Sequence, residues 1–167
     1  MDLQVPEAPT QYKSPQLYTF GALNNANGIV GASHYNSTTS EWESTTDMSI
    51  PNHGQCGAVV GTKIYLFGGR SNLIPVKIAQ IYDCETGNYS QYRSIPSPRW
   101  GCGAAVLNGY VYVAGGWDGT KLTSDVIRYN IGTTRREGVR SMQTARAGQN
   151  LVELGGRLYA IGGYTKT

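Results

Sequence analysis

A repeat with a fixed interval constrains the fold of this chain more than any other feature. An apolar run ending in a glycine doublet occurs at Gly68-Gly69, Gly115-Gly116 and Gly162-Gly163, and each step is 47 residues (68 to 115, 115 to 162). A fainter copy, Gly21-Ala22, stands one interval earlier. Further columns share this register: Tyr18, Tyr65, Tyr112 and Tyr159; Tyr35, Tyr82 and Tyr129; Gly54, Gly101 and Gly148; and Met48, Ile95 and Met142. Several columns in one register identify a repeat protein.

Each repeat contains only strand and turn signals. The stretches VVGTKIYLF, VLNGYVYVA and ELGGRLYAI join two apolar runs through Gly-Thr, Asn-Gly or Gly-Gly, which are dipeptides that tolerate a tight hairpin turn. A third strand carries a Tyr-Asp or Tyr-Asn pair, and a fourth centres on Trp42 or Tyr89. No helical period of useful length is present. Four antiparallel strands in one repeat predict an all-β fold built from β-propeller blades.

The glycine doublets allow two interpretations, a loop that binds phosphate or a joint in the repeat. A phosphate loop needs a following helix whose backbone amides face the anion. The segment GGWDGTKLTSDVIRYN predicts another strand instead. We therefore expect Gly68, Gly69, Gly115, Gly116, Gly162 and Gly163 to be structural. They allow close approach of backbones where the chain turns away.

The order of these signals resembles the kelch repeat: a hydrophobic run, Gly-Gly, a spacer, Tyr-Asp and then an aromatic residue. The best copy spans residues 101–130, and the resemblance covers residues 16–167, which leaves residues 1–15 as a polar, proline-containing leader. The segments ARAG and GGWDGTKLTSDV are similar to the kelch-like subgroup. In that subgroup the propeller follows BTB and BACK domains and recruits substrates to a cullin-type ubiquitin ligase.

This sequence departs from the kelch pattern in several places. The first doublet reads Gly21-Ala22, and Arg136 stands where Trp42 and Tyr89 provide an aromatic residue. The register begins at the second strand of one blade and ends at the second strand of a later one. That amounts to about three blades in an incomplete ring, and we expect a fragment or truncated form of a larger propeller. Neither BTB nor BACK is present, so a cullin-type ligase would be reached only through domains absent here.

Alternate loops of antiparallel blades lie on opposite faces, so the loop after each doublet shares a face with the segment that leads into a first strand. The candidate partner-binding residues on this face are Asn52, His53, Arg70, Arg99, Trp100, Trp117, Arg146 and Tyr164. Arginine and aromatic side chains are common in interface hot spots. The resemblance implies a protein or peptide partner, possibly an acidic motif. Arg99 and Arg146 could instead bind loop carbonyl groups. We expect Tyr35, Tyr82, Tyr129 and Trp42 to pack structurally.

Charge and cysteine content bound the partners and the location of the protein. A formal net charge of +3 is too small to predict nucleic acid or an anionic membrane as a partner. No apolar run is long enough to cross a membrane. Cys56, Cys84 and Cys102 form no C-x-x-C pair, which favours reduced thiols and a cytoplasmic location. We expect Cys56 and Cys102 to be packed and inert within small-residue first strands.

Three classes of function fit kelch blades. The leading hypothesis is a protein-interaction module that recognises substrates for a ubiquitin ligase, and the alternative is an actin-binding or cytoskeletal scaffold. The third is an enzyme resembling galactose oxidase, which holds copper with tyrosine and histidine ligands. His34 and His53 occupy different repeat positions, so we do not expect them to converge, and Glu153 is the one other ionisable group besides cysteine in the first strands. The sequence thus predicts no enzyme activity, metal or cofactor.

Overall fold

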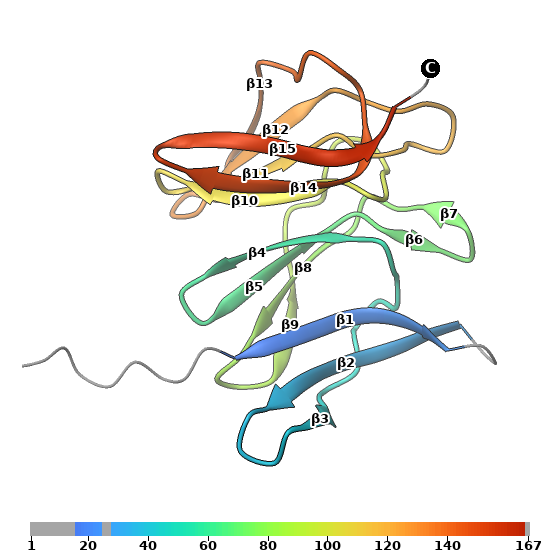
Figure 1. Ribbon diagram of the computed structural model, residues 1–167, viewed down its shortest axis with the longest axis vertical. Coiled ribbons are helices and arrows are strands. Elements are labelled where there is room, and N and C mark those ends of the chain that lie inside the picture. Colours follow the sequence, from blue (N-terminus) through green and yellow to red (C-terminus); the bar gives the residue numbers. More distant parts are fainter. Residues whose placement is uncertain (1–15, 25–27, 166–167) are drawn as a thin grey trace, which may run out of the picture.

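The computed structural model describes residues 16–24 and 28–165, and every regular element in these ranges is a β-strand. The strands form three-, four-, four- and two-stranded antiparallel sheets that follow one another along an open arc (Figure 1). The strands are β1 (Leu17–Asn24), β2 (Gly28–Asn36), β3 (Glu41–Ser44), β4 (Cys56–Val60), β5 (Lys63–Phe67), β6 (Arg70–Ser71), β7 (Ile74–Pro75), β8 (Ala79–Asp83), β9 (Asn88–Gln91), β10 (Gly103–Leu107), β11 (Tyr110–Ala114), β12 (Val126–Asn130), β13 (Arg136–Val139), β14 (Ala147–Leu154) and β15 (Arg157–Tyr164).

The sheets have the strand order expected of propeller blades. The complete ones are β4-β5-β8-β9 and β10-β11-β12-β13, the first sheet is β1-β2-β3 and the last is β14-β15, while β6 and β7 form a separate ribbon. The pairing register repeats with the sequence, because Ala58 pairs with Tyr65 and Ala105 pairs with Tyr112. The all-β fold with about three blades in an incomplete ring is confirmed. Within the described ranges there is no helix that could cross a membrane.

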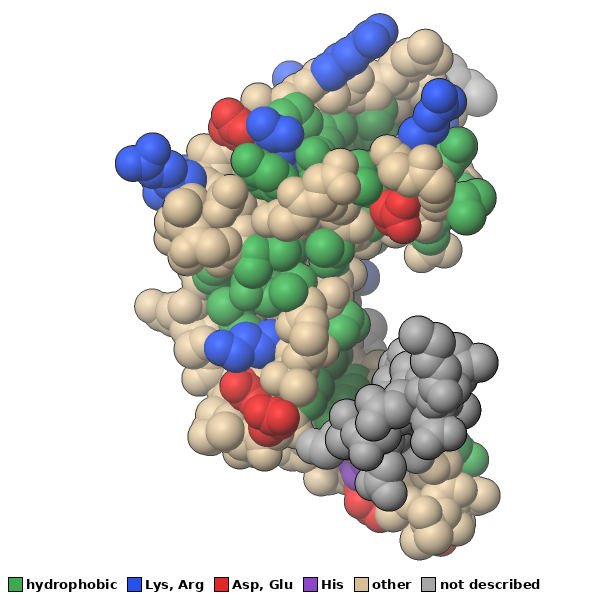
Figure 2. All heavy atoms as spheres, turned by 90° about the vertical axis from the view of Figure 1, so that its left-hand side faces the viewer, with side chains coloured by type: hydrophobic (Ala, Val, Ile, Leu, Met, Phe, Trp, Pro, Cys, Tyr) green, Lys and Arg blue, Asp and Glu red, His purple; other side chains and the backbone are tan. Residues whose placement is uncertain are grey.

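Adjacent sheets pack face to face through apolar side chains. Phe67, Val111 and Tyr129 are fully buried between the second and third sheets. On the other side of the second sheet, Ile64 and Tyr82 form a cluster with side chains of β1. Figure 2 views the side of the hairpin turns, where apolar side chains gather along the middle of the arc. Each sheet is therefore stabilised by burial against its neighbours, as in other repeat proteins.

The doublets Gly68-Gly69 and Gly115-Gly116 are joints between sheets. Gly68 and Gly115 both have positive φ, and a Cβ added at Gly115 would lie 2.6 Å from the carbonyl oxygen of Arg146. The second glycine of these two doublets donates its backbone N–H across the same gap. Gly69 donates to the carbonyl of Arg99, and Gly116 donates to that of Arg146, both over 2.8 Å. Glycine is needed at these positions because the backbone of the next repeat passes so close.

The third glycine column also connects the sheets. Gly101 donates its N–H to the carbonyl of Gly54 over 2.8 Å, and Gly148 donates to the carbonyl of Gly101 over 2.7 Å. All three have positive φ. These residues form a hydrogen-bonded ladder across three repeats, so each segment that leads into a first strand is fixed to the next one.

Of the aromatic residues predicted to pack structurally, those inside the arc are buried, whereas those on the terminal sheets are packed only in part. Tyr82 and Tyr129 are buried, and Tyr35 lies against Trp42 with ring centroids 5.4 Å apart. Trp42, in contrast, is 50% exposed, and Tyr159 is 42% exposed. Both lie on the terminal sheets, where no further sheet of the described chain covers them.

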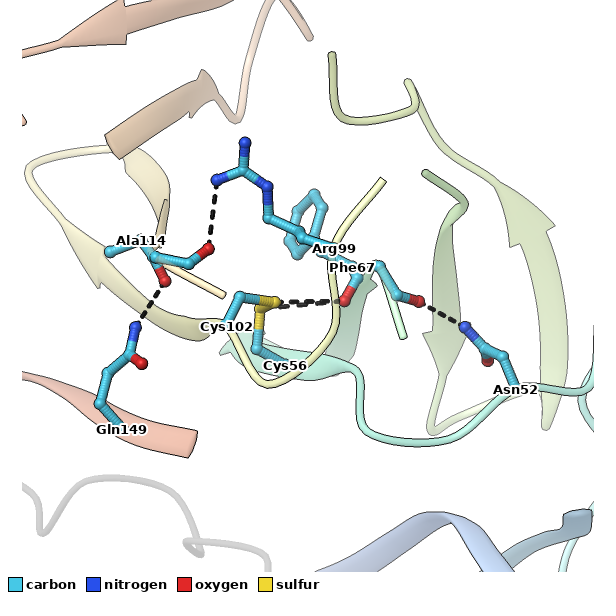
Figure 3. The surroundings of a disulfide bond; sticks show 9 residues. Asn52, Cys56, Phe67, Arg99, Cys102, Ala114 and Gln149 are labelled. Atoms are coloured by element: carbon cyan, nitrogen blue, oxygen red, sulfur yellow. Dashed lines mark hydrogen bonds between the residues drawn. A yellow bond between two sulfur atoms is a disulfide. The ribbon is translucent and has the colours of Figure 1, made fainter. Parts of the chain in front are cut away.

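The prediction of reduced, unlinked thiols at Cys56 and Cys102 is wrong, because these residues form a disulfide (Figure 3). Both are buried, as expected, and Cys84 is a free, partly buried thiol. The bond links β4 to the segment before β10, and its partners are 46 residues apart in sequence. The first strands of neighbouring repeats lie side by side, so residues one repeat apart can meet. The cytoplasmic location stays a prediction.

Candidate functional site

The candidate binding face is formed where the loop after each doublet meets the segment leading into a first strand. His53 and Arg70 exchange two backbone hydrogen bonds, of 3.1 and 2.8 Å. One repeat later Trp100 and Trp117 do the same, over 3.0 and 2.9 Å. The prediction that these segments share a face is therefore confirmed. We call this face, which carries the β6–β7 ribbon in Figure 1, the rim.

Three of the eight candidates form a structural column instead of a binding surface. Asn52, Arg99 and Arg146 each donate a side-chain hydrogen bond to the carbonyl of the first glycine of a doublet, sixteen residues further on. Asn52 is 2% exposed and Arg99 is 1% exposed, so the prediction that they lie on an accessible rim is wrong. Their side chains point inward (Figure 3) because the glycine carbonyls need donors there.

Arg99 is the most enclosed member of this column. Its guanidinium donates to the carbonyl of Gly115 over 3.2 Å and to the hydroxyl of Ser97 over 2.8 Å. Burial lowers the pKa of Arg99, while the carboxylate of Asp125, 4.0 Å away, acts in the opposite direction. The contacts support the structural alternative that the sequence left open for Arg99.

Arg70 is held in place by the two neighbouring aromatic side chains. Its Nε–H donates to Nε2 of His53 over 2.6 Å, and its guanidinium carbon lies 4.6 Å from the centroid of the Trp100 ring. Burial, together with the nearby positive charge of Arg70, lowers the pKa of His53. A neutral imidazole is what the hydrogen bond needs, because Nε2 must accept. We call His53, Arg70 and Trp100 the Arg70 stack.

Trp117 and Tyr164 continue the rim toward the last sheet. Trp117 is partly exposed and forms a second backbone bridge to Leu122. Tyr164 ends β15 and is exposed, and its ring lies beside Gly148. The accessible part of the predicted site therefore consists of Arg70, Trp100, Trp117 and Tyr164, together with Arg146, which is partly exposed although it bonds the carbonyl of Gly162. Binding by these side chains stays a prediction.

Sequence reasoning missed the β6–β7 ribbon, which begins at Arg70 and projects from the rim. Its turn is formed by Asn72 and Leu73, both with positive φ, and it presents Leu73 and Ile74 to solvent. A comparison of repeats could have found it. The apolar pair occupies the positions that Thr120 and Lys121 hold one repeat later.

The rim has the chemistry of a binding surface. In the part of the chain that the structure describes, no group of three or more His, Cys, Asp or Glu residues could hold a metal ion. A cavity of about 300 Å³ lies away from the rim, beside Arg99, Asp125 and Arg136. A second, of about 350 Å³, lies between β1 and the β4–β5 hairpin. Arg70 and the rim tryptophans instead offer charge and apolar area to a partner.

Sheets of four antiparallel strands, repeated in register and joined by glycine doublets, define a protein of the kelch β-propeller class. A sequence model described as the KLHDC2/KLHL20/DRC7 kelch-repeats domain matches residues 9–164, and the chain belongs to this family. A search of curated proteins finds no match to the chain. Membership of a kelch-repeat family indicates a protein-interaction module.

Proposed function

We propose that this chain recognises substrates for a cullin-type ubiquitin ligase by binding an acidic protein segment at the rim. The observation that carries the proposal is that the Arg70 side chain is fixed in position but has no anionic partner among the described residues. A hydrogen bond to His53 and stacking on the Trp100 ring hold the Arg70 side chain in place. No carboxylate among the described residues forms an ion pair with it. A positioned guanidinium without an anion is suited to a carboxylate supplied by another molecule.

The neighbours of Arg70 strengthen the proposal. Stacking on Trp100 leaves the terminal guanidinium nitrogens with donors to spare, because the side-chain hydrogen bond that Arg70 forms with the described residues uses Nε. Partly exposed Trp100 and Trp117 add apolar contact area beside this charge. Arginine and tryptophan are both enriched in interface hot spots. A partner would gain a charge-assisted hydrogen bond and burial of aromatic surface at one place.

The connection to a ligase rests on the resemblance to kelch-like proteins and on family membership. In such proteins the propeller selects the substrate, and the cullin is contacted by BTB and BACK domains. The rim described above would supply the first of these two activities. From the ligase role alone, we further propose that the protein acts in the cytoplasm, since the thiol argument for that location does not hold once Cys56 and Cys102 are linked.

Peptide binding tests the proposal directly. An array would present acidic peptides beside partners in which every Asp and Glu is replaced by Asn or Gln. We expect the wild type to prefer the acidic member of a pair, and Arg70→Glu to lose at least tenfold in affinity. Arg140→Glu, a charge reversal at an exposed arginine that follows β13, is the matched control and should bind like the wild type. Equal binding by Arg70→Glu and wild type would contradict the proposal.

The ligase step needs a separate experiment. The chain would be fused behind BTB and BACK domains and expressed with a protein that carries a selected acidic peptide. Ubiquitination that depends on Arg70 supports substrate recognition for a ligase. Binding to actin filaments in a cosedimentation assay, without ubiquitination, would favour a cytoskeletal scaffold instead.

A further inference from the structure

The β6–β7 ribbon ends in two consecutive exposed apolar side chains. Leu73 is 76% exposed and Ile74 is 67% exposed. We call this pair the apolar tip. Single exposed leucines are ordinary on protein surfaces, but two adjacent large aliphatic residues at the end of a projecting ribbon are costly to hydrate. The fold gains no burial from them in this position.

The next repeat shows that the fold does not need an apolar tip. Its corresponding loop, residues 118–121, reads Asp-Gly-Thr-Lys, and Asp118 accepts hydrogen bonds from the N–H groups of Thr120 and Lys121. The bases of the two loops are bonded identically. Val76 donates to the carbonyl of Gly69, and its counterpart Thr123 donates to that of Gly116, both over 2.9 Å. Two loops with the same hydrogen bond at the base therefore end differently: the loop at residues 118–121 has a polar turn, and the β6–β7 ribbon has an apolar one.

The apolar tip also costs backbone energy. Asn72 has φ of 47° and Leu73 has φ of 67°, which is the left-handed region. Asn is commonly found there, whereas a leucine without a glycine's freedom pays about 1 kcal/mol. A turn of this kind is ordinarily made with Asn-Gly. Strain and exposure together mark the ribbon as a feature held for something other than folding.

The ribbon is fixed with respect to the Arg70 stack. Arg70 is the first residue of β6 and pairs with Pro75 at the end of β7, and Pro75 lies against Gly119 of the neighbouring loop. Asn72 and Leu73 form the turn and Ile74 pairs with Ser71, the residue after Arg70, so the apolar tip begins one strand residue beyond Arg70, about 3.3 Å along the ribbon. The positive charge and the apolar tip are thus presented on one rigid element at a set separation.

We propose that the apolar tip is a second contact for the partner of the rim, and that the partner is an extended segment with a carboxylate and a large apolar side chain one or two residues apart. This inference rests on the proposed function and specifies it further. Arg70 and the Ser71–Ile74 pair at the tip are one strand residue apart, which matches a separation of one or two residues at about 3.3 Å per residue in an extended peptide. The tip is buried only when the partner is bound.

Selection from a displayed library of random twelve-residue peptides tests this inference. The decisive variant is Leu73→Thr/Ile74→Lys, which replaces both apolar side chains by the residues of the next repeat. We expect peptides selected by the wild type to combine an acidic and a large apolar residue at this spacing. Their affinity should fall at least tenfold in the variant. Leu154→Thr, which removes a 69% exposed leucine on β14, is the matched control and should bind like the wild type.

The outcomes separate the inference from the proposed function. Unchanged circular dichroism and melting of Leu73→Thr/Ile74→Lys would show that the hairpin is intact. Selected peptides that need Arg70 but bind this variant within twofold of the wild type would overturn the inference and leave the proposed function standing. If the selected peptides bind Leu73→Thr/Ile74→Lys and Arg70→Glu as tightly as the wild type, both the inference and the proposed function are overturned. A library from which the wild type enriches nothing would also overturn both.

Discussion

Among single residues, the column Asn52, Arg99 and Arg146 offers a matched comparison, because equivalent donors bind equivalent carbonyls in different surroundings. We expect Arg99→Met to lower the free energy of unfolding by about 2–3 kcal/mol, since it leaves a buried carbonyl without its charged donor. Arg146→Met removes the same hydrogen bond where water can replace it, so it should cost less than about 1 kcal/mol. Urea denaturation of both variants checks this. Equal losses of unfolding free energy in the two variants would contradict the expectation that burial of the carbonyl sets the cost of removing its donor.

His53 gives the stability of the rim a pH dependence. Burial and Arg70 lower its pKa in the folded state, so below the ordinary value of about 6.5 the unfolded chain binds more protons than the folded one. The contribution of neutral His53 is therefore complete above pH 6.5 and is lost as the pH falls through the folded-state pKa. A protonated ring also cannot accept the Nε–H of Arg70.

We expect wild-type stability to fall more between pH 7.5 and pH 5.5 than that of His53→Asn. Asn keeps an acceptor for Arg70 but does not titrate in this range. Urea midpoints at the two pH values, compared between the proteins, cancel the other titrating groups. An identical change of the urea midpoint between the two pH values in both proteins would mean that His53 does not cause the pH dependence of stability.

The repeat register predicted where the rim residues lie along the chain, but not which way their side chains point. Neighbours in the segments that lead into first strands face opposite directions, so Asn52 and Arg99 point inward while Trp100 lies on the rim. Spacing alone cannot distinguish an arginine that binds a partner from one that binds a buried carbonyl. That difference depends on the backbone of the following doublet, which comes close only in the folded arc.

At the scale of elements, the glycine doublets can be tested with an internal control. A Cβ at Gly115 would lie 2.5 Å from the side-chain nitrogen of Gln149 and 2.6 Å from the carbonyl of Arg146. Its counterpart Gly162 also has positive φ but has no atom within 4 Å of that position. We expect Gly162→Ala to cost about 1 kcal/mol for its backbone conformation, and Gly115→Ala to cost about 3 kcal/mol or more. Thermal and urea unfolding would measure both.

Equal destabilisation by the two substitutions would show that the doublet matters only for its φ. A difference of the expected size would show that it matters because the next repeat packs against it. Gly109→Ala serves as a further comparison, since this hairpin glycine has positive φ and open space around it.

The hairpins were predictable at this scale, and the ribbon was not. Strong alternation and turn dipeptides such as Asn108-Gly109 predict the β10–β11 hairpin, whose register the structure confirms. The strands of the β6–β7 ribbon have two residues each, which is too short for a periodic pattern. Its turn residues, Asn72 and Leu73, are not a pair that signals a tight turn. The ribbon forms because the doublet before it and the pairing of Arg70 with Pro75 bring its ends together.

At the scale of the whole molecule, the end faces of the arc carry the same repeat positions that are buried inside it. Tyr159 and Ile161 are exposed on β15, whereas their counterparts Tyr65 and Phe67 are buried against the third sheet. Burial in this protein is therefore a property of neighbouring sheets more than of residue type. The periodic sequence predicted which positions face an adjacent sheet, but it could not show which of them have one in the described arc.

The disulfide between Cys56 and Cys102 connects the two complete sheets, and we expect it to contribute a large part of the stability of the arc. Closing a loop between residues 46 apart restricts the unfolded chain, which corresponds to about 2–4 kcal/mol. We expect Cys56→Ala/Cys102→Ala to lose that much unfolding free energy, and a reducing agent to lower the stability of the wild type but not of this variant. Cys84→Ser, which removes the free thiol, should respond to reduction as the wild type does. Thiol labelling followed by mass measurement gives an independent check, because the unreduced, unfolded wild type should accept one label. Three labels under those conditions would mean that the sheets are held together by packing and backbone hydrogen bonds without a covalent link.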